Sequence, residues 1–222
     1  MGGAVCREEV TEVTEEKRSV DDSLTSADRI RRFTVKQFGY NVLILARRGL
    51  KDVPHELWEL LELEKLDLSL NSLKVLPPQL SLLSNLVVLN LWGNQLSSLP
   101  AEIGQLRRLR VLFAYRNRLA EVPEELGNCS QLEVLSLANN QLSSLPASLS
   151  NLTRLRKLNL SHNHIAHIPG CVYNMKALLE LLNLDFNDIK DVPQNRNRRA
   201  AGSDMLNSVN PSPVSLIHHQ CR

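Results

Sequence analysis

LEKLDLSLNSLKVLP, residues 63–77, is the stretch that decides the fold, because its spacing of leucines, asparagine and proline recurs along the chain. The pattern returns from residues 86, 109, 132 and 155, each copy starting 23 residues after the last. A degenerate copy starts at residue 40, and another starts at residue 179 with an offset of 24 residues. The 222-residue chain therefore contains about seven copies of one unit, five of them close to the ideal pattern.

Stacking of the units is required for folding, because the few leucines in one unit cannot offset the entropy lost in ordering it. Neighbouring units can bury each other's leucines in continuous columns. We predict two such columns along the strands: Leu66, Leu89, Leu112, Leu135 and Leu158, and Leu68, Leu91, Ala114, Leu137 and Leu160.

One asparagine in each unit follows the predicted strand, at the point where the chain turns inward. A buried turn leaves backbone groups without partners, and an amide side chain can both donate and accept hydrogen bonds. We therefore expect a structural role for these residues, which are Asn71, Asn94, Asn117, Asn140 and Asn163.

The pattern LxxLxLxxNxLxxLP on a 23-residue period resembles the leucine-rich-repeat superfamily over residues 40–193. The resemblance implies an α/β solenoid: a curved horseshoe with a parallel inner sheet and turns or short helices outside. The LP ending and the lack of cysteine-rich caps are similar to the intracellular class, which includes signalling scaffolds. The resemblance further implies a non-catalytic module that binds proteins.

Charge and motifs argue against two other functions. With 26 basic and 24 acidic residues the net charge is +2, which is too balanced to indicate a nucleic-acid surface. The chain has neither a glycine-rich phosphate loop nor a GxSxG motif, and flanks of 39 and 29 residues are too short for a catalytic domain. We expect no enzymatic activity, no cofactor and no nucleic-acid partner.

The cysteines and histidines do not predict a metal site. The cysteines are widely spaced, without a CxxC pair, and we expect reduced thiols at Cys6, Cys129, Cys171 and Cys221. Three clustered histidines have no carboxylate or cysteine at ligand spacing; they are His162, His164 and His167.

The N-terminal sequence bears on location. It lacks the apolar stretch of a secretory signal, so we expect a cytoplasmic protein. The start MGGAVC partly matches the myristoylation pattern MGxxx[ST], with Cys6 in place of the hydroxyl residue. Lipids on Gly2 and Cys6 would together anchor the chain to a membrane, whereas an ordinary tail is the alternative.

The residues that alternate with the strand leucines face away from the core, where repeat proteins of this kind bind partners. Trp92, Phe113, Tyr115 and Arg116 fall on two neighbouring strands of a chain that is only 4% aromatic. Tryptophan, tyrosine and arginine dominate interface energies. The candidate partner-binding residues are Trp92, Phe113, Tyr115, Arg116, Asp67 and Asn90.

The ends of the repeat array need covering. Residues 24–39 predict a cap helix, with Ile30, Phe33 and Phe38 within reach of the first repeat. Residues 1–23 and 194–222 are predicted to be disordered tails. Because the extra residue near Leu179 precedes an abrupt end of the pattern, we hypothesise a shortened product of a longer gene.

The sequence thus predicts a monomeric intracellular adaptor or scaffold, of the kind that acts in signalling, which docks a partner protein on its concave face. Two alternatives stay open at this point. The chain could be a regulatory subunit that inhibits an enzyme by steric blockade, or a lipid-anchored tether at a membrane surface.

Overall fold

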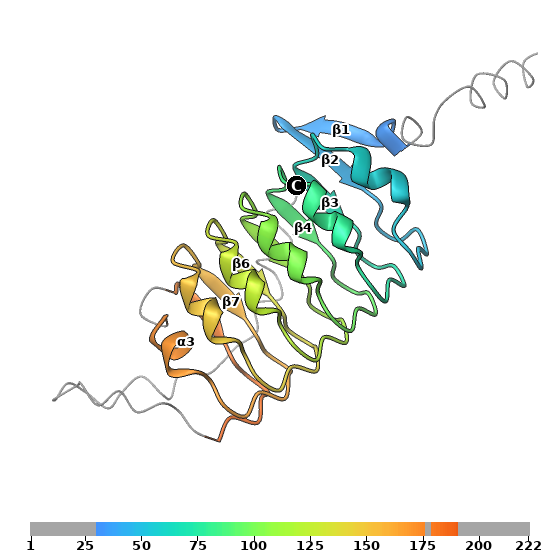
Figure 1. Cartoon of the computed structure of the whole chain (residues 1–222). Helices are drawn as coiled ribbons and strands as arrows, with labels where there is room; N and C mark the ends of the chain where they lie inside the picture. Colours follow the sequence, from blue (N-terminus) through green and yellow to red (C-terminus); the bar gives the residue numbers. More distant parts are fainter. Residues whose placement is uncertain (1–29, 176–178, 191–222) are drawn as a thin grey trace, which may run out of the picture.

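Seven three- to five-residue strands, one for each repeat, lie side by side in the computed structural model, which describes residues 30–175 and 179–190. They are β2 (Tyr40–Ile44), β3 (Lys65–Asp67), β4 (Val88–Asn90), β5 (Val111–Phe113), β6 (Val134–Ser136), β7 (Lys157–Asn159) and β8 (Leu181–Asn183). All are parallel and follow chain order in one open sheet (Figure 1). The predicted α/β leucine-rich-repeat solenoid is confirmed.

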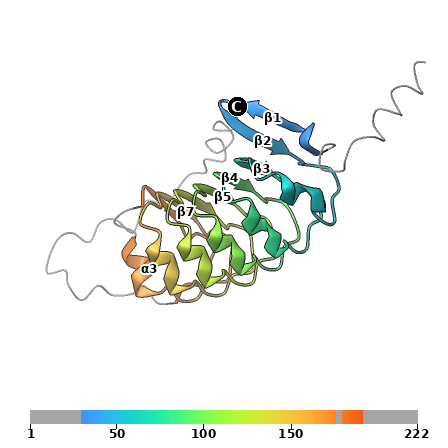
Figure 2. The ribbon, with the colours of Figure 1, turned by 45° about the horizontal axis from the view of Figure 1, so that its top comes forward.

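Short helices return the chain along the opposite side of the coil (Figures 1 and 2). They begin after the proline that ends each pattern, because proline is suited to the extended residue before a first helical turn. Five are 3-10 helices and one is an α-helix: η1 (His55–Glu59), η2 (Pro78–Leu82), η3 (Ala101–Gln105), η4 (Glu124–Asn128), η5 (Ala147–Asn151) and α3 (Gly170–Asn174).

The core lies between the sheet and these helices, and it consists of the leucine columns that the sequence predicted. Leu66, Leu89, Leu112, Leu135 and Leu158 are paired in register on successive strands. Each is at most 1% exposed, as is every member of the column from Leu68 to Leu160. The sheet surface that points away from this core is called the open face below.

The asparagines form a buried ladder that fastens each repeat to its neighbours. The Asn140 amide donates to the carbonyl oxygens of Ala114 and Leu137, at 3.0 and 2.9 Å. Its Oδ1 accepts the Leu119 N–H at 3.0 Å. The same bonds recur at the other members, which confirms the predicted structural role of Asn71, Asn94, Asn117, Asn140 and Asn163.

A left-handed backbone residue precedes each ladder asparagine. Its positive φ turns the chain so that the asparagine enters the core, and only Gly93 is a glycine there. The position is held by Leu70, Gly93, Arg116, Asn139 and His162, and Arg47 and Phe186 adopt the same conformation before Arg48 and Asn187. Because a non-glycine residue pays about 1 kcal/mol or more in this conformation, the neighbouring ladder bonds must impose it.

The N-terminal end is covered by a strand, not by the predicted helix. β1 (Thr34–Gln37) pairs antiparallel with β2, so the cap helix expected over residues 24–39 is wrong where β1 lies. A helix would leave the outer N–H and C=O groups of β2 unpaired, whereas a strand satisfies them. Residues 24–29 and both predicted tails lie outside the described residues.

The three apolar residues of the predicted cap differ in how far they are buried. Ile30 packs against the core as expected, and Phe33 is half exposed beneath the Arg48 guanidinium, 5.5 Å from the ring centre. Phe38 is 78% exposed in the β1–β2 turn, with a φ of 51°. The prediction that Phe38 covers the first repeat is therefore wrong.

The extra residue of the last repeat is absorbed on the helix side. Here α3 replaces the 3-10 helix of the other repeats. α3 has five residues, as each of the 3-10 helices has, and the segment between α3 and β8 is one residue longer than the segment between η5 and β7. Leu158 still pairs with Leu182, and strand register is preserved.

Replacing a ladder asparagine should destabilise the fold strongly. Asn140→Ala leaves the Leu119 N–H and two carbonyl groups without these partners in the core, and we expect a loss of about 2–4 kcal/mol. The exposed Asn151→Ala is the matched control, with an expected change within about 0.5 kcal/mol. Urea unfolding followed by circular dichroism measures both, and equal midpoints would contradict the ladder's role.

Candidate functional site

Three aromatic side chains meet on the open face. Trp92 follows β4, Phe113 ends β5 and Tyr115 lies two residues further on. The Trp92 and Tyr115 rings stack, with centroids 5.3 Å apart and planes 7° apart. Phe113 meets Tyr115 edge-on at 6.3 Å and 80°. The rings therefore hold one another in place and stay partly exposed.

Arg116 extends this cluster on the side where β5 ends. Its backbone N–H donates to the Ala138 carbonyl at 2.9 Å, and its φ is 54°. The side chain is exposed, and no described carboxylate forms an ion pair with it. A fixed backbone thus carries an exposed guanidinium on the residue that follows Tyr115.

Asp67 and Asn90, also predicted to bind the partner, have a structural task. The Asp67 carboxylate accepts the Ser69 N–H at 2.8 Å, and Asn90 Oδ1 accepts the Trp92 N–H at 3.4 Å. Asn159 and Asn183 make the same bond two residues along the chain. An acceptor at this spacing is a turn signal that the sequence analysis overlooked.

A row of valines on the open face was missed by the sequence analysis. Val88, Val111 and Val134 pair in register at the start of three strands and are partly exposed. Lys65 and Lys157 continue the row at its two ends. The alternation within each strand signals this row, since residues two apart share a face. We call the three aromatics and three valines the apolar patch.

Paired charges lie beside the valine row, at the residue just before each strand. Arg110 contacts Glu133 at 2.8 Å, and Arg156 contacts Glu180 at 3.5 Å. The Glu64 carboxylate accepts the Asn41 N–H at 2.9 Å. This edge of the sheet is therefore polar, and most of its charges are neutralised by ion pairs. A polar rim beside an apolar centre is the arrangement found in protein interfaces.

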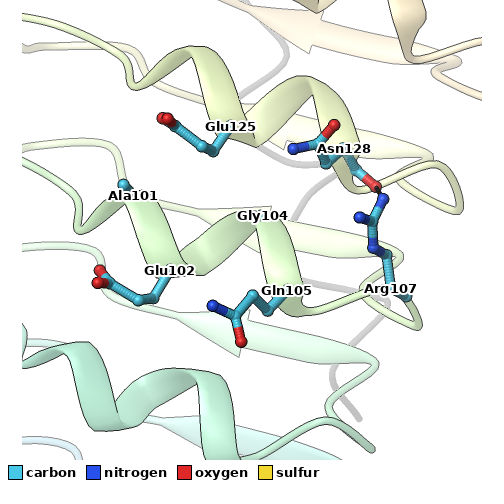
Figure 3. Close-up of a pocket in the computed structure, with 7 residues that line it drawn as sticks. All are labelled: Ala101, Glu102, Gly104, Gln105, Arg107, Glu125 and Asn128. Atoms are coloured by element: carbon cyan, nitrogen blue, oxygen red, sulfur yellow. Dashed lines mark hydrogen bonds between the residues drawn. The ribbon is translucent and has the colours of Figure 1, made fainter.

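A hollow lies on the opposite side of the coil, between η3 and η4 (Figure 3). Its volume is about 290 Å³, and the Arg107 guanidinium donates across its end to the Asn128 carbonyl at 2.8 Å. Glu102 and Glu125 extend in parallel from neighbouring helices (Figure 3). It is a surface gap between two repeats, without an arrangement that suggests catalysis.

The close approach of η3 and η4 depends on glycine. A Cβ on Gly104 would lie 2.4 Å from the Glu125 carbonyl oxygen, and one on Gly127 would lie 2.4 Å from that of Ser148. Both distances are shorter than any real contact, so these two positions permit the helices to stack.

The histidines are placed apart from any metal-binding arrangement. His162 stacks on Phe186 with centroids 4.3 Å apart, and His164 Nδ1 lies 3.5 Å from the Asp188 carboxylate. Across the described part of the chain, no three His, Cys, Asp or Glu side chains gather as metal ligands.

The two described cysteines, both free thiols, differ sharply. Cys129 takes a leucine position in the core, where its thiol donates to the Ile103 carbonyl at 3.3 Å. Burial raises the pKa of the Cys129 thiol to about 11, and the nearby Arg107 lowers it only partly. Cys171 is exposed. Cys6, with Gly2 the predicted lipidation site, lies outside the described residues.

Comparison with known families agrees with this architecture. A family model described as a leucine-rich repeat region matches residues 40–161 and 102–196, which together cover more than half of the chain. A comparison with curated proteins gives no match. In the ranges that the structure describes, no helix is long and apolar enough to cross a membrane.

Filling the glycine contact between η3 and η4 should destabilise the protein. Gly104→Ala places a methyl group against the Glu125 backbone, and we expect a loss of about 1–3 kcal/mol. Gly170→Ala is the control, because its Cβ would have open space at the start of α3. Thermal unfolding compares the two, and an equally stable Gly104→Ala variant would refute the close contact.

The buried thiol should react only after unfolding. In a Cys6→Ser/Cys221→Ser background at about pH 8, we expect a thiol reagent to label Cys171 quickly and Cys129 only in denaturant. Because the pKa of Cys129 is raised to about 11, the unfolded chain loses this proton first. The thiol's contribution to stability should therefore fall as pH rises from about 9 to 11. Rapid labelling of two thiols in the native protein would contradict this.

Proposed function

Because this chain belongs to the leucine-rich repeat family, we propose that it is an intracellular adaptor that binds a partner protein on the concave, open face of its sheet. Leucine-rich repeat regions are generally non-catalytic modules for protein interaction. The adaptor role and the choice of face are the proposal. They rest on the side chains of β4 and β5.

The observation that carries the proposal is the stack of Trp92 on Tyr115, with Phe113 against it. Rings that already support one another lose little conformational freedom when a partner binds. The patch places apolar side chains at the centre and charged ones around it, which is the composition of an interface hot spot. Scattered single aromatics would carry no such implication.

Asp67 and Asn90 enter this proposal as supports of the surface. Their side-chain oxygens fix the backbone two residues further on, at Ser69 and Trp92. We propose that Asn90 positions Trp92 for binding and that the aromatic rings and Arg116 contact the partner directly.

The alternatives differ in what the bound partner can still do. An adaptor holds two proteins together, whereas an inhibitory subunit occludes the active site of one enzyme. The patch supports both equally, and the activity of a recovered partner separates them. Lipidation at Gly2 and Cys6, and with it a membrane tether, stays a prediction from the N-terminal sequence, as does the cytoplasmic location.

The experiment compares proximity labelling by the full chain with labelling by Trp92→Ala/Tyr115→Ala. Each truncation of a hot-spot aromatic costs about 2 kcal/mol, so we expect the double variant to lose affinity by at least about 100-fold. His162→Ala/Phe186→Ala is the matched control, because it removes another stacked pair near the last repeat.

The outcomes are distinct once circular dichroism shows that all three proteins are folded. Partners labelled by the parent and the control but lost from Trp92→Ala/Tyr115→Ala support the proposal. Identical partners for all three proteins, or loss only from the control, would place the interface elsewhere.

A further inference from the structure

Two cations beside the apolar patch have no ion-pair partner among the described residues. Arg116 and Lys157 are both exposed, and neither forms an ion pair with a described carboxylate. Lys65, at the other end of the valine row, is engaged instead, with its ammonium group 4.0 Å from the centre of the Tyr40 ring. Two positive charges are thus available on different sides of the patch.

The carboxylates in the same region each have an ion-pair or hydrogen-bond partner. Glu133 is bound to Arg110, and Glu64 accepts a backbone N–H. Asp67 lies two strands before β5, and its Oδ1 accepts the Ser69 N–H. Glu64 and Asp67 keep their negative charge, but they lie on the β3 side of the patch. On the open face of β5, β6 and β7 the charges without an ion pair among the described residues are those of Arg116 and Lys157, and a complementary ligand brings negative charge to them.

The register of the sheet sets how far apart these cations lie. Lys157 pairs with Val134, which pairs with Val111, so Lys157 is two strands away from β5. Arg116 lies five residues after Val111. With about 4.8 Å between strands and about 3.3 Å per residue, their Cα atoms are roughly 19 Å apart. An extended chain covers that distance in about six residues.

From these contacts, and resting on the proposed function, we propose that the open face binds an extended acidic segment of the partner. An apolar side chain of that segment lies on the Trp92–Tyr115 stack. Carboxylates about five to seven residues apart bind the Arg116 guanidinium and the Lys157 ammonium. Arginine beside a carboxylate forms two parallel hydrogen bonds, which gives this end of the segment its orientation.

The experiment selects ligands from a displayed library of random peptides of about 16 residues, using the full chain as bait. We expect enriched peptides to carry Asp or Glu about five to seven residues apart, with aliphatic or aromatic residues between them. The charge-reversed Arg116→Glu/Lys157→Glu protein should bind those peptides at least tenfold more weakly and should select Lys or Arg at the same spacing.

Two further variants separate this inference from the proposed function. Lys51→Glu/Lys74→Glu reverses two exposed charges outside the apolar patch and should leave the acidic preference unchanged. Trp92→Ala/Tyr115→Ala should lose the selected peptides altogether. Peptides that depend on the aromatic pair but carry no acidic preference would overturn the inference and leave the proposed function standing.

Other results would also overturn the inference. These are an unchanged acidic preference in the charge-reversed protein, or no peptide enriched over a blank surface. Displacement of the selected peptide by a single-stranded oligothymidylate at equal concentration would indicate phosphate recognition in place of carboxylate recognition. All exchanged side chains are exposed or on the open face, and unfolding midpoints within a few degrees of the parent exclude a folding defect.

Discussion

Each ladder asparagine joins three stretches of chain, and the rest of the structure depends on that connection. The Asn140 amide bonds carbonyls 26 and 3 residues before it, and its oxygen bonds the N–H 21 residues before it. One side chain therefore fixes its own turn and its place against the preceding repeat. Because the bonds are buried, a shifted repeat would leave polar groups unsatisfied in the core. The leucine columns supply the larger apolar gain, but they alone do not select the register.

Register in turn determines what the open face presents. Every second side chain of a strand points outward, and the bonds in the core hold neighbouring strands in register. Trp92 and Tyr115 are therefore brought together on the open face by interactions made in the core. The outward side chains contribute little to core packing. The face can thus vary in composition without loss of the fold, and its aromatic centre and unmatched cations call for an explanation in terms of binding.

Much of this could be predicted from the sequence, because leucines and asparagines at the same positions do the same physical work in one unit after another. The clustering of Trp92, Phe113 and Tyr115 followed from the period alone.

The strand β1 could not be predicted in this way, since the need to pair the outer edge of β2 arises only in the assembled sheet and outweighs local helix signals. The turn role of Asp67 was readable from its spacing to Ser69 but was overlooked. The left-handed φ of Arg116 was hidden, because it depends on backbone geometry after the strand. The valine row was readable by alternation and was overlooked. The binding roles assigned to these residues, the tails and the suspected shortening stay predictions.

The last repeat, which contains α3, shows that the strand side and the helix side of the coil differ in how they accommodate a change in length. The chain between α3 and β8 is one residue longer than in the repeat before it, and the pairing of Leu158 with Leu182 is intact. In each repeat the strand is therefore fixed by its pairing, whereas the helix side, which returns the chain to the next strand, can change in length. Insertions and deletions in such a gene would be tolerated on the helix side, whereas the strands would change in number only when whole repeats are gained or lost. Recognition and length variation can then evolve on opposite sides of the same coil without interfering with each other.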